Sequence, residues 1–264
     1  MTAFMLDPTI HPAIVTRGLR KAFGDFVAVH GIDLLVPRGS FYGFLGPNGA
    51  GKSTTIKCLT GLLRPTGGTC EILGMNPLAD PVMVKRHVGV VPEDLALFDR
   101  LTGAETLSFV GQVHGIDRTE VRERSLELLT LMDLTSAAND LVADYSHGMR
   151  KKIALSAALL PAPRLLFLDE PFEGVDAIAS RQIKELLTAF VKGGGTVFLT
   201  THILEIVERL CDHIGIIQKG RLVAQGSMAE LRAGGVTGQS LEERFMDIVG
   251  HSSSTMPALD WLSG

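Results

Sequence analysis

The nine residues GPNGAGKST, at positions 46–54, decide how the rest of this sequence is interpreted. They fit the pattern GxxxxGK[ST], in which a glycine-rich loop between a strand and a helix surrounds phosphate oxygens with backbone N–H groups. The apolar stretch FYGFLG runs into the loop, and STTIKCLTGLL continues from it with the pattern of a helix. A glycine-rich turn that matched by chance would lack these neighbours, so we predict a phosphate-binding loop.

Each type of residue in this phosphate loop has a mechanical role. Glycines let the backbone curl so that its N–H groups face the phosphates, Lys52 reaches the outer two phosphates, and the Ser53 hydroxyl can ligate Mg²⁺. The predicted phosphate-binding residues are Gly46, Pro47, Asn48, Gly49, Ala50, Gly51, Lys52, Ser53 and Thr54.

A second motif, RLLFLDEP at residues 164–171, predicts a buried strand with two carboxylates at its end. Open α/β sheets place their ligands at the carboxyl ends of such strands. We expect Asp169 to hold Mg²⁺, directly or through water, and Glu170 to polarise the water that attacks the γ-phosphate. The alternative is a pair of acidic residues that only cap the strand.

A third strand, TVFLT, leads into His202. An imidazole at this place can donate a hydrogen bond to a γ-phosphate and act as a catalytic group. Taken alone, a histidine after a strand is more often a satisfied polar cap, so this functional interpretation depends on the two motifs before it.

With these motifs in this order, the chain resembles the ATP-binding subunit of ABC transporters, and specifically the single-domain ATPases of bacterial exporter-type systems. The resemblance covers residues from about 13 to 250 and identifies GPNGAGKST as the Walker A loop, which binds ATP, and LLFLDE as the Walker B strand. It also implies that EGVD, ending at Asp176, is the D-loop and that His202 is the switch histidine. Phe23 stands where the family places an aromatic residue that stacks on adenine, although packing alone could also explain an aromatic residue there.

One departure from the family lies at Glu93, in VVPEDLALFDRLT, where the family usually has a glutamine. A carboxylate can still reach Mg²⁺ or the attacking water. We expect Glu93 to act as the sensing loop and as a metal ligand, with altered Mg²⁺ dependence. The alternative is a solvated acidic pair with Asp94.

A second departure is YSHGM, residues 145–149, where the family signature is LSGGQ. Ser146 and Gly148 are retained, whereas His147 replaces a glycine and Met149 replaces a glutamine. The resemblance implies that these four residues act on ATP held by a partner chain. The exposed N–H groups at the start of the helix after Ser146 suit an anion.

The three cations that follow, Arg150, Lys151 and Lys152, are interpreted as a solvated helical face that also raises the local positive potential.

The order of strand and helix patterns predicts an α/β fold: a P-loop NTPase core with a parallel sheet, an N-terminal antiparallel β subdomain and an inserted α-helical subdomain. We assign residues 13–94 and 161–226 to the ATPase core, and 95–160 to the helical subdomain that carries the signature. Residues 227–264 are expected to form C-terminal helices and a tail, with one helix at about 241–249.

The composition is that of an ordinary globular protein, with 45% hydrophobic residues and a net charge of −4, so no nucleic-acid partner is expected. The cysteines, Cys58, Cys70 and Cys211, are scattered, which favours reduced thiols in the cytosol over a metal cluster. The first residues lack the pattern of a secretory signal, and the longest apolar stretch is broken by Pro161 and Pro163. Another chain is therefore expected to supply any membrane part.

These observations predict an ATP-hydrolysing subunit, with ATP and Mg²⁺ as cofactors, that powers a membrane exporter from the inner face of the cell membrane. The expected partners are a second ATPase chain, identical or homologous, in a head-to-tail dimer and a separate transmembrane permease. Phe98 and Leu101 are candidates for the apolar contact with that permease, although internal packing of their loop is an equal alternative. A soluble ATP switch of the same family that acts on nucleic acid or ribosomes, and a P-loop small-molecule kinase, remain alternatives.

Overall fold

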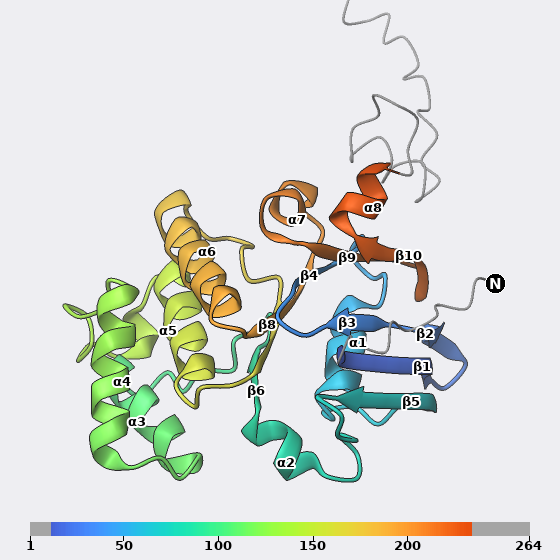
Figure 1. Cartoon of the computed structure of the whole chain (residues 1–264). Coiled ribbons are helices and arrows are strands. Elements are labelled where there is room, and N and C mark those ends of the chain that lie inside the picture. The colour runs from blue at the N-terminus through green and yellow to red at the C-terminus, as the bar shows by residue number, and fades with distance from the viewer. Residues whose placement is uncertain (1–11, 234–264) are drawn as a thin grey trace, which may run out of the picture.

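The computed structural model describes residues 12–233, which form a mixed α/β fold (Figure 1). The strands are β1 Pro12–Phe23, β2 Phe26–Ile32, β3 Leu35–Pro37, β4 Phe41–Leu45, β5 Gly67–Ile72, β6 Val88–Val91, β7 Leu165–Asp169, β8 Thr196–Thr201, β9 His213–Gln218 and β10 Arg221–Ser227. The α-helices are α1 Lys52–Leu59, α2 Pro81–Arg86, α3 Gly103–Val113, α4 Arg118–Leu131, α5 His147–Leu159, α6 Ala177–Lys192, α7 Leu204–Leu210 and α8 Met228–Ala233. The helix predicted at 241–249 lies outside the described residues.

The central sheet has six strands in the order β10-β9-β4-β8-β7-β6. All neighbouring pairs are parallel except β9 with β10, which form an antiparallel hairpin. Because β4, β8 and β7 are adjacent and parallel, the three segments that follow them meet at one edge of the sheet. This arrangement confirms the predicted parallel α/β core.

The central strands β4, β7 and β8 are buried on both faces, as their mostly apolar sequences require. In β7, Leu166 and Leu168 belong to one hydrophobic cluster, and Leu165 and Phe167 belong to a second. The first cluster includes side chains of α5 and α6, whereas the second includes those of α1 and the antiparallel strands. The sheet therefore separates two cores and is held rigidly between them.

The antiparallel subdomain contains β1, β2, β3 and β5, with β1 paired to the other three strands. The stretch FVAVHGIDLLV, residues 26–36, has a composition that favours β-structure and is divided into β2 and β3. The division falls at Asp33, whose carboxylate accepts a hydrogen bond of 2.6 Å from the Gly18 N–H. This side-chain contact coincides with the interruption between the two strands.

Helices α3, α4 and α5 lie between β6 and β7 in the chain and gather on the side of the molecule opposite the antiparallel strands (Figure 1). A capping box between Thr102 and Glu105 begins α3, and the Asp117 side chain caps α4. The helical pattern predicted for this part of the chain is confirmed.

The three cysteines are buried free thiols. Burial raises the pKa of the Cys70 thiol to about 12, so it stays protonated and unreactive near neutral pH. Among residues 12–233, no helix has the length and apolar character needed to cross a membrane.

Candidate functional site

The phosphate loop, residues 46–54, joins β4 to α1 and depends on two close backbone approaches. A Cβ atom on Gly46 would lie 2.3 Å from the carbonyl oxygen of Ile217, and one on Gly51 would lie 2.7 Å from that of Ala28. Gly51 also has a φ of 107°, which side chains rarely adopt. Since Gly51 has no side chain to cap α1, the first N–H groups of this helix remain available to an anion.

The loop borders a cavity of 470 Å³. The lining combines backbone and cationic donors from the loop with two acidic side chains and one aromatic ring. It consists of Asn48, Gly49, Gly51, Lys52, Ser53, Thr54, Phe26, Ala28, Glu93 and Glu170. The remaining loop residues, Gly46, Pro47 and Ala50, do not line it. This donor set and volume suit a polyphosphate with an attached aromatic base.

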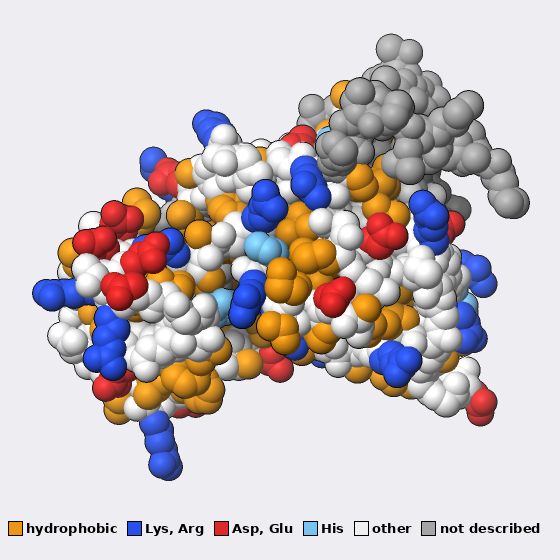
Figure 2. Space-filling view, turned by 60° about the horizontal axis from the view of Figure 1, so that its bottom comes forward, with side chains coloured by type: hydrophobic (Ala, Val, Ile, Leu, Met, Phe, Trp, Pro, Cys, Tyr) orange, Lys and Arg blue, Asp and Glu red, His pale blue; other side chains and the backbone are white. Residues whose placement is uncertain are grey.

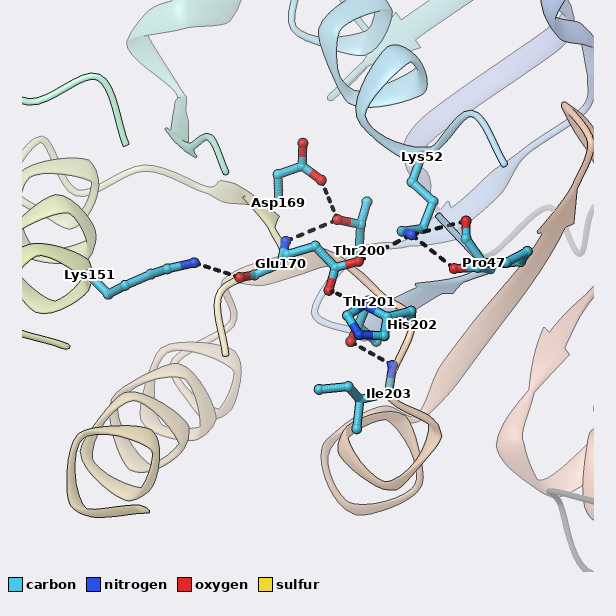
Figure 3. Close-up of polar contacts among 10 residues, drawn as sticks. Pro47, Lys52, Lys151, Asp169, Glu170, Thr200, Thr201, His202 and Ile203 are labelled. Carbon is cyan, nitrogen blue, oxygen red and sulfur yellow. Dashed lines mark hydrogen bonds and ion pairs between the residues drawn. The ribbon is translucent and has the colours of Figure 1, made fainter. Parts of the chain in front are cut away.

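Lys52 is almost fully buried although it carries a charge. Its ammonium donates hydrogen bonds to the carbonyl oxygens of Gly46, at 2.9 Å, and Pro47, at 3.3 Å. Nζ also lies 3.1 Å from Oε1 of Glu170 (Figure 3). Phosphate oxygens in the cavity would offer the same cation stronger, charged acceptors.

The two carboxylates at the end of β7 are both buried, Asp169 at 3% exposure and Glu170 at 5%. The Thr200 hydroxyl, on β8, donates to Asp169 and accepts from the Glu170 N–H at 3.1 Å. The Glu170 backbone has a φ of 48°, an uncommon conformation for a residue with a side chain. Thr200 therefore holds the step from β7 into the following turn.

The Glu170 carboxylate is placed between two cationic or ionisable groups (Figure 3). Oε2 lies 3.2 Å from Nδ1 of His202, and Oε1 lies within ion-pair distance of Lys52. Oε1 is fully buried and accepts no hydrogen bond from the described residues. The Lys52 ammonium lies within ion-pair distance of Oε1, but the angles of this contact are not those of a hydrogen bond. A buried carboxylate oxygen with spare accepting capacity is suited to take a proton from water.

The three predicted metal ligands are Ser53, Asp169 and Glu93. Ser53 and Glu93 line the cavity, whereas Asp169, the last residue of β7, is not among its lining residues. In the part of the chain that the structure describes, no three His, Cys, Asp or Glu residues cluster closely enough to enclose a metal. In proteins, Mg²⁺ usually binds through one or two protein oxygens together with substrate phosphates and water.

The aromatic residue that lines the cavity is Phe26, which sequence reasoning missed. Phe23 pairs with Phe26 across the β1–β2 hairpin and lies under the Lys21 ammonium, 4.8 Å from its ring centre. Both rings are solvent-exposed, Phe23 at 48% and Phe26 at 67%. Both phenylalanines lie in the sequence KAFGDF, residues 21–26. The tight turn at Gly24 brings their rings to the same end of the hairpin.

The family model described as ABC transporter matches residues 29–173, more than half of the chain. The chain belongs to the ABC transporter ATP-binding family. The daunorubicin/doxorubicin resistance ATP-binding protein DrrA of Streptomyces peucetius is 42% identical over 221 residues, covering 84% of this chain and 67% of the relative. The linearmycin resistance ATP-binding protein LnrL of Bacillus subtilis (strain 168) is 38% identical over 223 residues, covering 84% and 72%.

A solved structure described as the ATP-binding subunit of an ABC transporter has a TM-score of 0.84 to this chain at 31% identity, and the match covers 89% of this chain and 99% of that one. The predicted family and fold are therefore confirmed. As an ABC transporter ATP-binding domain, the chain binds nucleotide and hydrolyses ATP.

The predicted signature segment, YSHGM at residues 145–149, leads into the N-terminus of α5. The Ser146 hydroxyl caps the helix by accepting a hydrogen bond of 3.2 Å from the Met149 N–H. Among the described residues, the lining of the nucleotide cavity includes none of the four predicted signature residues, Ser146, His147, Gly148 and Met149.

The signature segment packs against the D-loop, residues 173–176. Asp176 caps α6 by accepting from the N–H groups of Ile178 and Ala179, both at 2.9 Å. Gly148 is closely packed here, because a Cβ on it would lie 3.2 Å from Oδ2 of Asp176. Nε2 of His147 lies 3.3 Å from the Glu173 carbonyl oxygen, so the replacement of glycine by histidine adds a polar contact to the D-loop.

The interpretation of Arg150, Lys151 and Lys152 as a solvated face is wrong. Lys151 and Lys152 are 3% and 7% exposed, and Arg150 is partly buried. Arg150 donates to the Val142 carbonyl at 2.9 Å and pairs with Asp99 at 2.8 Å, so it too is held by the protein. The sequence contained a signal for this burial: the following IALSAALL has no polar face, which indicates a helix enclosed on all sides.

Proposed function

We propose that this ABC ATPase powers an exporter, as the names of its drug-resistance relatives suggest, through ATP-driven pairing of two chains. The observation that carries the proposal is that Glu170, which lines the cavity with Lys52, contacts both Lys52 and His202, so that segments following three adjacent parallel strands meet there. The soluble-switch and kinase alternatives gain no support from these relatives.

In this proposal Glu170 is the general base. When ATP occupies the cavity, Lys52 turns to its phosphates and the Glu170 carboxylate is released to bind the attacking water. The water oxygen attacks the γ-phosphorus, its proton passes to Glu170, and the bond to ADP breaks to leave inorganic phosphate. His202 contacts the Glu170 carboxylate through one ring nitrogen and binds the γ-phosphate through the other, and so fixes their relative positions.

Ser53, Asp169 and Glu93 would hold Mg²⁺, which supplies positive charge to the phosphate oxygens when bound. Glu93, in the segment after β6, is the residue of the sensing loop that contacts the metal ion or the attacking water. As a carboxylate it makes this site more negative than a glutamine would, and so favours the divalent ion.

The signature segment supports a composite site. Since Ser146 and Gly148 lie outside the cavity of their own chain, we infer that they meet the γ-phosphate of ATP held by a second chain, packed head to tail. The second chain can be identical or homologous. Hydrolysis then removes the γ-phosphate and releases the pair.

A groove between the core and the helical subdomain supports a permease partner at the inner face of the membrane. This groove encloses 240 Å³ and is lined by Phe98 and Phe109, whose exposed rings meet edge to face at 5.2 Å. Leu101, the other predicted contact, does not line it. An apolar segment of a permease would cover these two rings.

The face of the molecule shown in Figure 2 gives no specific support to a nucleic-acid partner. On the face shown in Figure 2, Lys and Arg side chains are interspersed with Asp, Glu and hydrophobic side chains, without a continuous basic strip among the described residues. Recognition of a phosphate backbone usually requires such a strip.

The proposal is tested by two variants measured for ATP binding and for phosphate release with Mg²⁺. Lys52→Ala should weaken ATP binding by roughly tenfold or more, because it removes a charged donor to the phosphates. Glu170→Gln should keep ATP binding within about threefold of the unmodified protein and lower kcat by roughly a hundredfold or more. A Glu170→Gln protein with unchanged kcat would contradict the role of Glu170.

A further inference from the structure

Lys151 is a buried cation in α5 whose role the nucleotide site does not explain. Its side chain is 3% exposed, and its ammonium donates a hydrogen bond of 2.7 Å to the backbone carbonyl of Glu170 (Figure 3). A buried ammonium is costly unless it is paired and hydrogen-bonded. A lysine that only filled space here could be replaced at lower cost by an apolar residue, so its polar contact calls for an explanation.

The contact falls on the part of Glu170 that most needs support. Its φ of 48° is uncommon for a residue with a side chain, and such backbones persist only where their surroundings fix them. Thr200, on β8, accepts from the Glu170 N–H, and Lys151, on α5, donates to the Glu170 carbonyl. Two different elements therefore hold the two sides of this residue.

We propose that Lys151 is a positioning residue for ATP hydrolysis, which fixes the Glu170 backbone and links it to the signature helix. The inference rests on the proposed role of Glu170 as general base. Through its carbonyl, Lys151 sets the direction in which the Glu170 carboxylate leaves the backbone. Misplacement of such a group by about 1 Å can cost on the order of a hundredfold in rate.

The position of Lys151 in α5 gives this link a second consequence. Lys151 follows Ser146 by five residues, about 7.5 Å along the helix axis at 1.5 Å per residue. A helix moves as a stiff unit, so a shift of its N-terminus against a partner's nucleotide also moves the ammonium on Glu170. Lys151 thus makes the hydrolytic group of one composite site depend on contact made at the other.

Charge and hydrogen bonding both contribute at this position. The carboxylates that interact with the Lys151 ammonium belong to Glu173, Glu170, Glu93 and Asp169. They favour its charged form, whereas burial, the larger effect, lowers its pKa. Substitutions can separate the two contributions, because glutamine keeps a donor without charge and methionine keeps neither.

Arg150 provides a matched control in the same turn of α5. It also donates from a cationic side chain to a backbone carbonyl, but to Val142 within the helical subdomain, and it pairs with Asp99. The full chain is compared as Lys151→Met, Lys151→Gln, Arg150→Met and Arg150→Gln, with Glu170→Gln alongside. Each variant is measured for thermal unfolding, ATP affinity, and kcat and KM for ATP.

We expect Lys151→Met to lower kcat by roughly ten- to a hundredfold while KM for ATP changes by less than about threefold. Lys151→Gln should recover part of the loss, because its amide can reach the carbonyl. The Arg150 variants should unfold at lower temperature and keep kcat within about threefold. Should Lys151→Met fail to fold, the comparison of Lys151→Gln with Arg150→Gln decides, and Lys151→Gln alone should show the lower kcat.

The inference is overturned if folded Lys151 variants keep the unmodified kcat, or if the Arg150 variants lose kcat to the same extent. Glu170→Gln distinguishes this failure from failure of the proposed function. If that variant loses turnover while the Lys151 variants do not, Glu170 is the base and Lys151 does not position it. If Glu170→Gln retains turnover, the proposed function itself fails.

Discussion

Two helix N-termini of this protein, those of α1 and α5, are both suited to an anion but are built differently. Helix α1 follows Gly51, receives no side-chain cap from it and opens onto the 470 Å³ cavity of its own chain. Helix α5 follows Ser146, whose hydroxyl already accepts from the Met149 N–H, and its first turn packs against the D-loop.

The difference indicates that the chain contains one phosphate-binding site with its full set of polar groups and one helix end without them. The N-terminus of α1 is surrounded by the lysine, hydroxyl and carboxylate groups that the chemistry needs. The N-terminus of α5 offers an exposed, capped end with a small residue, Gly148, and the acidic cap of α6 beside it. In the proposed pairing, a phosphate bound at α5 would arrive with another chain, and substitution at either helix end tests this comparison.

The largest effect is expected from Ser146→Arg. A long charged side chain at the start of α5 would block approach of a second chain's phosphate, so ATP hydrolysis should fall to background, a loss of roughly a hundredfold or more. Binding of ATP to the isolated monomer, measured by equilibrium titration, should stay within about twofold, because Ser146 lies outside that cavity.

Ser146→Ala is the control for size, since it removes the hydroxyl without adding a side chain that blocks a second chain, and loss of the helix cap should cost about 1 kcal/mol of unfolding free energy. If Ser146→Arg abolished ATP binding by the monomer, the signature would serve its own chain's nucleotide and the comparison of the two helix ends would fail.

A smaller effect is expected at the aromatic residues near α1. Phe26→Ala should weaken ATP binding by roughly three- to tenfold, because Phe26 lines the cavity and a stacked aromatic ring contributes about 0.5–1.5 kcal/mol. Phe23→Ala serves as its neighbour across the hairpin, and titration of both variants shows which ring contacts adenine. A larger loss of ATP affinity in Phe23→Ala than in Phe26→Ala would support Phe23 as the residue that stacks on adenine, as the family resemblance implies.

The parallel core was predictable because its signals are local and strong. A few consecutive residues are enough to predict each of its parts: the continuous apolar strands, the glycine-rich loop and the acidic end of β7. Short elements with weak patterns were not predictable. Helix α2 has six residues with Val84 alone among them buried, so it carries no helical periodicity to detect.

Parts of the site were missed because they depend on contacts between distant segments. Three adjacent cations, Arg150, Lys151 and Lys152, suggest solvent exposure. The apolar residues after them indicate a buried helix, but not that Lys151 lies against the turn after β7. Nineteen residues separate Lys151 from Glu170, and no local pattern records that distance. Similarly, Phe26 enters the cavity through the path of the β1–β2 hairpin and not through its own sequence context.

The central claim, that each chain contains half of two ATP sites, is tested most directly by the oligomeric state of Glu170→Gln. This variant should bind ATP with Mg²⁺ but fail to hydrolyse it, and so accumulate in the closed pair. With ATP, light scattering after size-exclusion chromatography should show twice the mass of one chain. The mass should be that of one chain without nucleotide, and also with ATP when Ser146→Arg is added to the same protein. A Glu170→Gln protein that remains a monomer with ATP bound would contradict the claim.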